Sequence, residues 1–366
     1  MSLASELHPA DLAVAKARDP LAPVRAWLWL TLGLVLLMIT IGGATRLTGS
    51  GLSITEWKPI SGALPPLSNA DWLAEFERYR QIPQYELLNK GMTLGEFQFI
   101  YWWEWSHRQL GRLIGLVYLA GFLWFAIRRT LSLRATALLF AVGLLLGLQG
   151  AIGWIMVASG LQPGMIAVAP VKLTLHLVFA SLFLMSLAAM AVAMTPPRAT
   201  EKPATSGLRA GAWIVLALTL FQIALGGLVA GSRAGLNYNT WPLMDGQWVL
   251  PAEQLFAKTP FIENFVDNIP LVQFNHRLGA YLLVIVAILH AVFASRALPG
   301  SSFTKRARAL AALFTGQAAL GIATLLLAVP LWAGLAHQAY AMVVLTMATI
   351  HLARATGARV GARAGA

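Results

Sequence analysis

Residues 104–112 read Glu-Trp-Ser-His-Arg-Gln-Leu-Gly-Arg where a long apolar stretch begins, and residues 273–280 read Gln-Phe-Asn-His-Arg-Leu-Gly-Ala where another begins. These two stretches place His107 and His276 at matching points of the chain. Each is followed by a second histidine, His176 or His337, near the start of a later apolar stretch. Ionisable residues inside a membrane are costly, so four of them in a repeated pattern indicate function.

The composition is that of a helical membrane protein. The chain is 58% hydrophobic and only 11% charged, whereas soluble domains carry about 25% charged residues. Backbone polar groups in lipid must be satisfied within helices or closed barrels. The sequence therefore predicts an all-α polytopic membrane protein with eight transmembrane helices, each long enough to span a bilayer. The eight apolar stretches are 24–44, 106–128, 135–159, 173–195, 210–231, 274–295, 308–329 and 333–353.

The chain contains an internal repeat that makes up two similar halves. Gly42-Gly43 matches Gly226-Gly227, and Trp57 matches Trp241 at the same offset. Each repeat has four apolar stretches, an even number, so both halves share one orientation. We expect two pseudo-twofold-related four-helix bundles. The predicted division is an N-terminal tail 1–23, an N-terminal half 24–195, a linker 196–208, a C-terminal half 209–354 and a C-terminal tail 355–366.

The distribution of charge predicts the orientation. The net charge is +12, but the Lys and Arg residues concentrate in the tails and in the loops after the second, fourth and sixth apolar stretches. This is the positive-inside pattern, which places both termini in the cytoplasm. The basic loops therefore contact lipid headgroups rather than nucleic acid. With no signal or transit peptide in the first 22 residues, a bacterial inner membrane is the expected location.

The two long loops, 45–105 and 232–273, are then extracytoplasmic. The first contains a polar segment, from about Asn69 to Gln81, that we expect to be helical. The chain has no cysteine, which excludes disulfides, iron–sulfur clusters, thiolate-ligated haem and c-type haem attachment.

The four repeated histidines favour haem ligation. His107 and His176 begin spans that run in the same direction, as do His276 and His337, so each pair can face each other at similar depth. Two imidazoles are what a six-coordinate haem iron needs. A non-haem metal site and a structural or proton-relay role remain alternatives, although copper and zinc sites usually add carboxylate or sulfur ligands. Two further histidines, His290 and His351, are expected to lie near the cytoplasmic end and to be interfacial or hydrogen-bonded to a neighbour.

One asymmetry separates the halves. Glu104 lies three residues before His107, on the same helix face, whereas Gln273 holds the matching position before His276. A buried carboxylate can move protons or stabilise developing positive charge. Chemistry is therefore expected in the N-terminal half. The alternative is that Glu104 simply pairs with Arg108 or another base.

Several arginines flank the histidines and could bind haem propionates or, equally, lipid phosphates. They are Arg46, Arg108, Arg112, Arg233 and Arg277.

The chain resembles the haem A synthase family over about residues 24–353. The resemblance is carried by long, specific strings at residues 42–53 (Gly-Gly-Ala-Thr-Arg-Leu-Thr-Gly-Ser-Gly-Leu-Ser), 55–60 (Thr-Glu-Trp-Lys-Pro-Ile), 99–108 (Phe-Ile-Tyr-Trp-Trp-Glu-Trp-Ser-His-Arg), 235–244 (Gly-Leu-Asn-Tyr-Asn-Thr-Trp-Pro-Leu-Met) and 274–279 (Phe-Asn-His-Arg-Leu-Gly). Some members of that family have paired cysteines in the extracytoplasmic loops, and this chain has none.

The resemblance implies oxidation of the C8 methyl of haem O to the formyl group of haem A, for insertion into terminal cytochrome oxidases. It implies that His107 and His176 face the substrate haem O, and that His276 and His337 ligate the iron of a haem b cofactor. Glu104 matches the family's essential glutamate in the Glu-x-x-His pattern.

The implied partners are haem O, a haem O synthase and an electron donor. A di-haem b-type membrane electron carrier is the competing function, and a haem transporter is a third. The Glu104/Gln273 asymmetry disfavours the carrier, since pure electron transfer needs no carboxylate in one half only. Small-residue steps such as Gly143-x-x-x-Gly147 leave a homo-oligomer open.

Overall fold

The structure, a computed structural model, describes residues 19–196 and 203–362. Within these ranges it contains α-helices and short 3-10 turns but no named strand. Parts of the predicted tails 1–23 and 355–366 and of the predicted linker 196–208 fall on residues 1–18, 363–366 and 197–202, outside the described residues.

Eight helices of the described chain are long and apolar enough to cross a membrane, as the sequence predicted. Each overlaps one of the eight expected stretches. They are α1 (Ala22–Leu47), α4 (Leu94–Ile127), α5 (Leu133–Gly160), α6 (Pro170–Ala193), α7 (Ser206–Gly231), α10 (Ile269–Ala297), α11 (Ser302–Leu326) and α12 (Leu331–Thr356).

The helix α4 begins 12 residues before the expected span at 106. A capping box explains the early start: the Thr93 side chain accepts from the Glu96 backbone N–H, and the Glu96 carboxylate accepts from the Thr93 N–H. Helicity thus continues through the aromatic and polar residues that precede the apolar stretch. His107 lies well inside the helix, not at its beginning.

The helices pack in two groups. α1 and α5 each contact α4 and α6, while α7 and α11 each contact α10 and α12. The two groups meet where α1 and α6 contact α12 and where α6 contacts α7. One continuous apolar core includes residues of both groups, among them Leu28, Leu187 and Leu345. This packing is compatible with the predicted pair of four-helix bundles.

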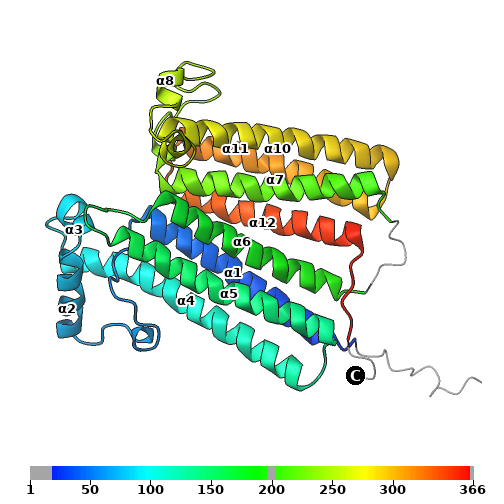
Figure 1. Cartoon of the computed structure of the whole chain (residues 1–366), viewed down its shortest axis with the longest axis horizontal. Helices are drawn as coiled ribbons and strands as arrows, with labels where there is room; N and C mark the ends of the chain where they lie inside the picture. Colours follow the sequence, from blue (N-terminus) through cyan, green and yellow to red (C-terminus); the bar gives the residue numbers. More distant parts are fainter. Residues whose placement is uncertain (1–18, 197–202, 363–366) are drawn as a thin grey trace, which may run out of the picture.

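The long loops gather at one end of the molecule, which we call the loop end. Figure 1 shows α2 (Asn69–Arg80), α3 (Pro83–Leu88) and α8 (Ala252–Leu255) beyond that end of the helices, with the last turn of α12 at the opposite end. The same loops hold α9 (Asn264–Asp267) and the 3-10 turns η1 (Ser61–Ala63), η2 (Ala234–Leu236) and η3 (Phe261–Glu263).

The expected helical segment in the first loop is confirmed as α2. Its start is fixed by a capping box between Ser68 and Asp71. Aromatic rings then attach it to α4: Phe76 stacks on Phe97 with ring centres 4.9 Å apart, and Tyr79 lies 5.4 Å from Phe97. Burial of these rings holds the loop over the end of α4 that leads to His107.

Candidate functional site

The four repeated histidines lie at equivalent places near the loop end. His176, His276 and His337 lie about two turns after the starts of α6, α10 and α12, and His107 lies about four turns into the longer α4. All four imidazoles are half-buried. The structure therefore brings the predicted residues to the same end of the helices, one on each even-numbered span.

The N-terminal pair is close enough to share one metal. The ring centres of His107 and His176 are 6.5 Å apart. Metal–imidazole distances are about 2 Å. Since a ring nitrogen lies about 1 Å from its ring centre, a metal between two imidazoles keeps the centres roughly 6 Å apart. In the other half, His276 and His337 lie within electrostatic range of each other.

The donor set also suits a haem. Among the residues that the structure describes, no three His, Cys, Asp or Glu side chains gather to hold a bare metal ion. Each pair therefore offers two imidazoles, the ligand set of a bis-histidine haem, in which the tetrapyrrole supplies the rest of the coordination sphere.

Each imidazole lies against a glycine of the preceding long helix. A Cβ built on that glycine would come within 2.8 to 3.2 Å of a ring atom, closer than real Cβ atoms normally approach. At 2.8 Å a Cβ would force the ring or the helix to move, and at 3.0 to 3.2 Å the ring would have to shift by a few tenths of an ångström. The pairs are Gly42 with His107, Gly153 with His176, Gly226 with His276 and Gly321 with His337.

Three of the histidines are also bridged by a glutamine. In each case the amide Nε2 donates to the backbone carbonyl of the histidine at 2.9 Å and lies 3.0 to 3.2 Å from its Nδ1. The pairs are Gln149 with His176, Gln222 with His276 and Gln317 with His337.

From the sequence alone, these glutamines had no predicted role in the site. The missed signal is a repeated Gln-x-x-x-Gly, in which the glutamine lies four residues before the glycine that contacts the histidine. It occurs at residues 149–153, 222–226 and 317–321. In α1 the same position before Gly42 is Met38.

Glu104 is buried, and both of its carboxylate oxygens have partners. Oε2 accepts from the Ser53 hydroxyl and from the Ile54 backbone N–H, each at 2.9 Å. Oε1 accepts from Arg108 Nη2 at 2.6 Å and from Nε at 3.1 Å. The pairing with Arg108 that the sequence left open as an alternative is therefore present. The geometry is that of an ionised carboxylate that also fixes the loop to α4.

The C-terminal half repeats this arrangement without the charge. Gln273 is buried, and its Nε2 donates to the carbonyls of Ala234 and Asn237, while its Oε1 accepts from Arg277 at 2.9 Å. Arg277 also donates to the Tyr238 carbonyl, as Arg108 does to the carbonyl of Ile54. Both halves thus use an arginine one turn after this position to hold the loop. Only the N-terminal half has a negative charge there.

Two of the other flanking arginines also donate to backbone carbonyls. Arg46 donates to Gly231 at the end of α7, and Arg112 donates to the carbonyls of Lys58 and Pro59. Arg233 is exposed and within electrostatic range of Arg46.

Three of the five arginines keep one buried N–H without a partner in the described residues. These are Arg46 Nε, Arg112 Nη1 and Arg277 Nε. Unsatisfied buried donors are unusual in folded proteins and suit an anionic ligand.

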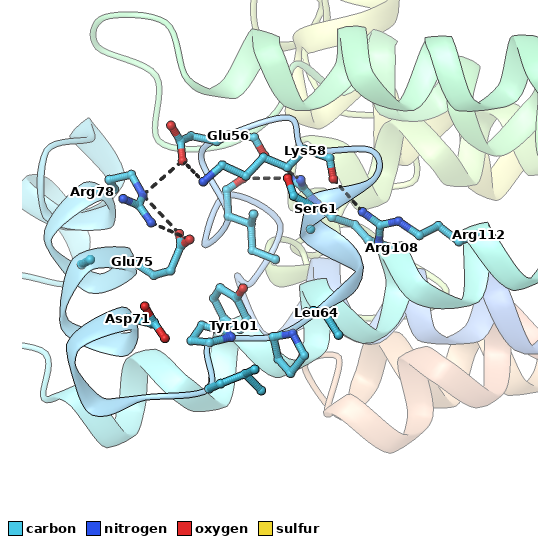
Figure 2. A pocket seen from close by; sticks show the side chains of 16 residues that line it. Glu56, Lys58, Ser61, Leu64, Asp71, Glu75, Arg78, Tyr101, Arg108 and Arg112 are labelled. Atoms are coloured by element: carbon cyan, nitrogen blue, oxygen red, sulfur yellow. Dashed lines mark hydrogen bonds and ion pairs between the residues drawn. The ribbon is translucent and has the colours of Figure 1, made fainter.

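A pocket of about 450 Å³ opens beside the Glu104–Arg108 pair. Figure 2 shows Glu75 and Arg78 on one side of it and Arg108 and Arg112, which belong to α4, on the other. Glu56 pairs with Lys58 at 2.6 Å, and the hydrogen bond from Lys58 lowers the pKa of the Glu56 carboxyl. The pocket thus offers mainly paired charges at neutral pH.

The prediction for the remaining two histidines is confirmed. His290 and His351 are buried and hydrogen-bonded to each other, with their Nε2 atoms 2.9 Å apart. They lie near the ends of α10 and α12 that are away from the loop end, so they belong to neither histidine pair described above.

Comparisons with known proteins identify the family of this chain. The sequence profile of a family described as cytochrome oxidase assembly protein matches residues 25–349. The chain is similar to Heme A synthase of Methylorubrum extorquens (strain PA1), with 62% identity over 334 residues, 91% of this chain and 87% of the relative. It is similar to Heme A synthase of Methylobacterium sp. (strain 4-46), with 58% identity over 95% of this chain and 98% of the relative. It is also 51% identical to Heme A synthase of Azorhizobium caulinodans over 93% and 95% of the two chains.

Proposed function

The chain belongs to the haem A synthase family of cytochrome oxidase assembly proteins, and from that premise we propose how its two histidine pairs divide the work. It is an oxidoreductase that converts haem O to haem A, by oxidation of the C8 methyl to a formyl group, for terminal cytochrome oxidases. The electron-carrier alternative is not favoured, because the relatives are named as synthases over nearly their whole length.

We assign the N-terminal pair, His107 and His176, to the substrate haem O. The observation that supports this most strongly is the buried carboxylate of Glu104, three residues before His107, where the other half has the neutral Gln273. Removal of electrons from a methyl group leaves positive charge at the carbon, which a fixed negative group stabilises. Only the N-terminal half offers such a group.

Glu104 could move a proton or stabilise positive charge, and the hydrogen bonds to its carboxylate oxygens favour the second role. Four donors surround the carboxylate, so it is placed as a fixed acceptor rather than as a group free to collect a proton. We propose that Glu104 stabilises positive charge developing at the methyl carbon and that Arg108 orients it. Such preorganised charges require little rearrangement during the reaction.

We assign His276 and His337 to a resident haem b. Their half supplies two imidazoles, two contacting glycines and two bridging glutamines, and the Oε1 atoms of Gln222 and Gln317 are buried without a partner. The amide Nε2 of each glutamine contacts both the backbone carbonyl and the Nδ1 of its histidine, and such a partner fixes the orientation of a ring that would ligate the iron. Bound there, haem b would supply one-electron redox chemistry.

The two pairs are joined through α1 and α12. Gln338, next to His337, donates to the Ile39 carbonyl at 2.6 Å. Three residues later on α1, Gly42 contacts the ring of His107. This short packed route connects the residue next to His337, which would hold haem b, with the ring of His107, which would face the substrate.

We further propose that the protein lies in a bacterial inner membrane with both termini in the cytoplasm and the loop end outside. The basic tails and loops support that orientation. The free buried N–H groups of Arg46, Arg112 and Arg277 support contact with haem propionates. By the electron-removal route proposed here, the overall change is R–CH3 + H2O → R–CHO + 4 H+ + 4 e−, so the protein needs a redox partner that accepts these electrons. A haem O synthase would supply the substrate.

Haem analysis of the purified protein tests this proposal. The chain would be produced in cells that also make haem O, and its extracted haems separated by chromatography. We expect haem b together with haem O and haem A. Haem b alone, in an amount that fills both sites, would instead identify a di-haem electron carrier.

A further inference from the structure

The four histidines differ in how firmly the structure holds their rings. Helices α1, α5, α7 and α11 each place a glycine against one histidine, and three of them also place a glutamine four residues earlier. α1 breaks this pattern. Its residue at that position is Met38, and its histidine is His107.

The glutamines restrict ring rotation. In each of the three pairs the amide contacts both the backbone carbonyl and the Nδ1 of the same histidine. The amide nitrogen carries only hydrogens, so it donates to the carbonyl and to Nδ1. Contacts to two atoms of one histidine fix the orientation of a ring that would ligate a metal.

Met38 occupies the position of such a glutamine but has no amide group to hydrogen-bond with the histidine. Its Cε lies 3.4 Å from a Cβ built on Gly111, one turn after His107. The Oε1 of Gln222 lies against Gly279, one turn after His276, in the same way. A thioether donates no hydrogen bond. Within the described residues the ring of His107 contacts His176 and Gly42 but has no hydrogen-bond partner.

We propose that Met38 makes His107 the exchangeable ligand of the substrate haem. This rests on the proposed assignment of His107 to haem O. A synthase must release its product, whereas a resident cofactor must stay. The three imidazoles that contact a glutamine stay oriented toward their haems. The imidazole of His107, which has no such partner, can leave the iron, so that haem O can enter the N-terminal site and haem A can leave it.

The test is to give His107 the missing amide. Methionine and glutamine have similar length, so Met38→Gln changes packing little while adding a donor and an acceptor. The release rate is measured by the transfer of haem from the detergent-solubilised protein to a soluble haem-binding apoprotein, with haems O and A followed separately from haem b. We expect release of haems O and A to slow about 10- to 100-fold, the usual effect of such partners on metal affinity.

Two further variants keep the result interpretable. Met38→Leu lacks an amide and should release haems O and A at the wild-type rate. Gln222→Met, the reverse exchange at His276, should speed release of haem b by a similar factor and leave haems O and A unaffected. The ferric absorption and electron paramagnetic resonance spectra should change only for the haem whose histidine contacts the substituted residue. That haem is the one at His107 for Met38→Gln and the one at His276 for Gln222→Met.

Two outcomes would overturn the inference. If haems O and A leave Met38→Gln within about twofold of the wild-type rate, Met38 does not set the exchange. If Met38→Leu slows release as much as Met38→Gln, packing rather than the amide is responsible. A wild-type protein that carries haem b alone, in an amount that fills both sites, would overturn the proposed function itself, a different result from haems O and A being present with unaltered release.

Discussion

At the scale of single residues, the halves differ by one charge in otherwise matching networks. Glu104 and Gln273 each reach a loop backbone and each pair with an arginine four residues later. The shared network explains why a buried polar residue is present in both halves, namely to hold the loop. It leaves the negative charge of Glu104 unexplained by structure alone, and the proposed role in catalysis accounts for it.

Glu104→Gln should therefore block haem A formation while haem b stays bound. The amide keeps the size and the partner Arg108 but loses the charge, and removal of one preorganised electrostatic group typically costs about 10²- to 10³-fold in rate. The measurement is the haem A to haem O ratio in cells that supply haem O, beside the haem b content of the purified variant. Haem A at the normal rate would rule out the proposed role.

Gln273→Glu is the matched control. It introduces a carboxylate beside Arg277 in the other half, where the proposal places no methyl oxidation. Haem A formation should continue in this variant. If it fails while both haems stay bound, the asymmetry between the halves would need another explanation.

At the scale of helices, the site depends on close contact between neighbours. The odd-numbered and even-numbered spans approach closely enough at four glycines for a histidine ring to touch the backbone. Because a methyl group there would force the helix or the ring to move, these glycines set the position of each imidazole.

Gly321→Ala should displace His337 and weaken haem b binding about tenfold or more, since overpacking typically costs roughly 1–3 kcal/mol. Gly153→Ala should do the same to the substrate haem through His176. Haem content after purification is the readout. Gly150→Ala, on the same helix as Gly153 with open space around the new methyl, should bind both haems normally; losses equal to those of Gly153→Ala would indicate a general packing defect.

Sequence patterns anticipated these helices well because apolar length is a strong signal. The start of α4 was the main error, since the capping box at Thr93 and Glu96 extends a helix beyond its apolar stretch. The four site histidines and Glu104 stood out from the repeat. The glutamines did not, because a polar residue in a span has many uses and only the fold brings Gln222 to His276 across 54 positions.

At the scale of the whole molecule, the two halves share one apolar core and a direct hydrogen bond between α12 and α1. A repeat could have left two independent haem proteins side by side. The shared interface instead lies between the two histidine pairs, where electrons would pass.

The proposed orientation predicts where the ends and the loops lie. A reporter that is active only in the cytoplasm should work when fused after Ala366 and fail when inserted at Gly246 in the second loop. A reporter that is active only outside should give the opposite results. Activity of the outside reporter at the C-terminus would reverse the assignment of the loop end.

Each half is proposed to hold a different haem, and haem analysis of two single variants is the decisive experiment. His107→Ala and His276→Ala would be purified from cells that supply haem O, and their haems separated. We expect His107→Ala to lose haems O and A and keep haem b, and His276→Ala to lose haem b and keep haem O. Loss of haem b from His107→Ala with retention of haems O and A, or equal loss of all haems from both variants, would contradict it.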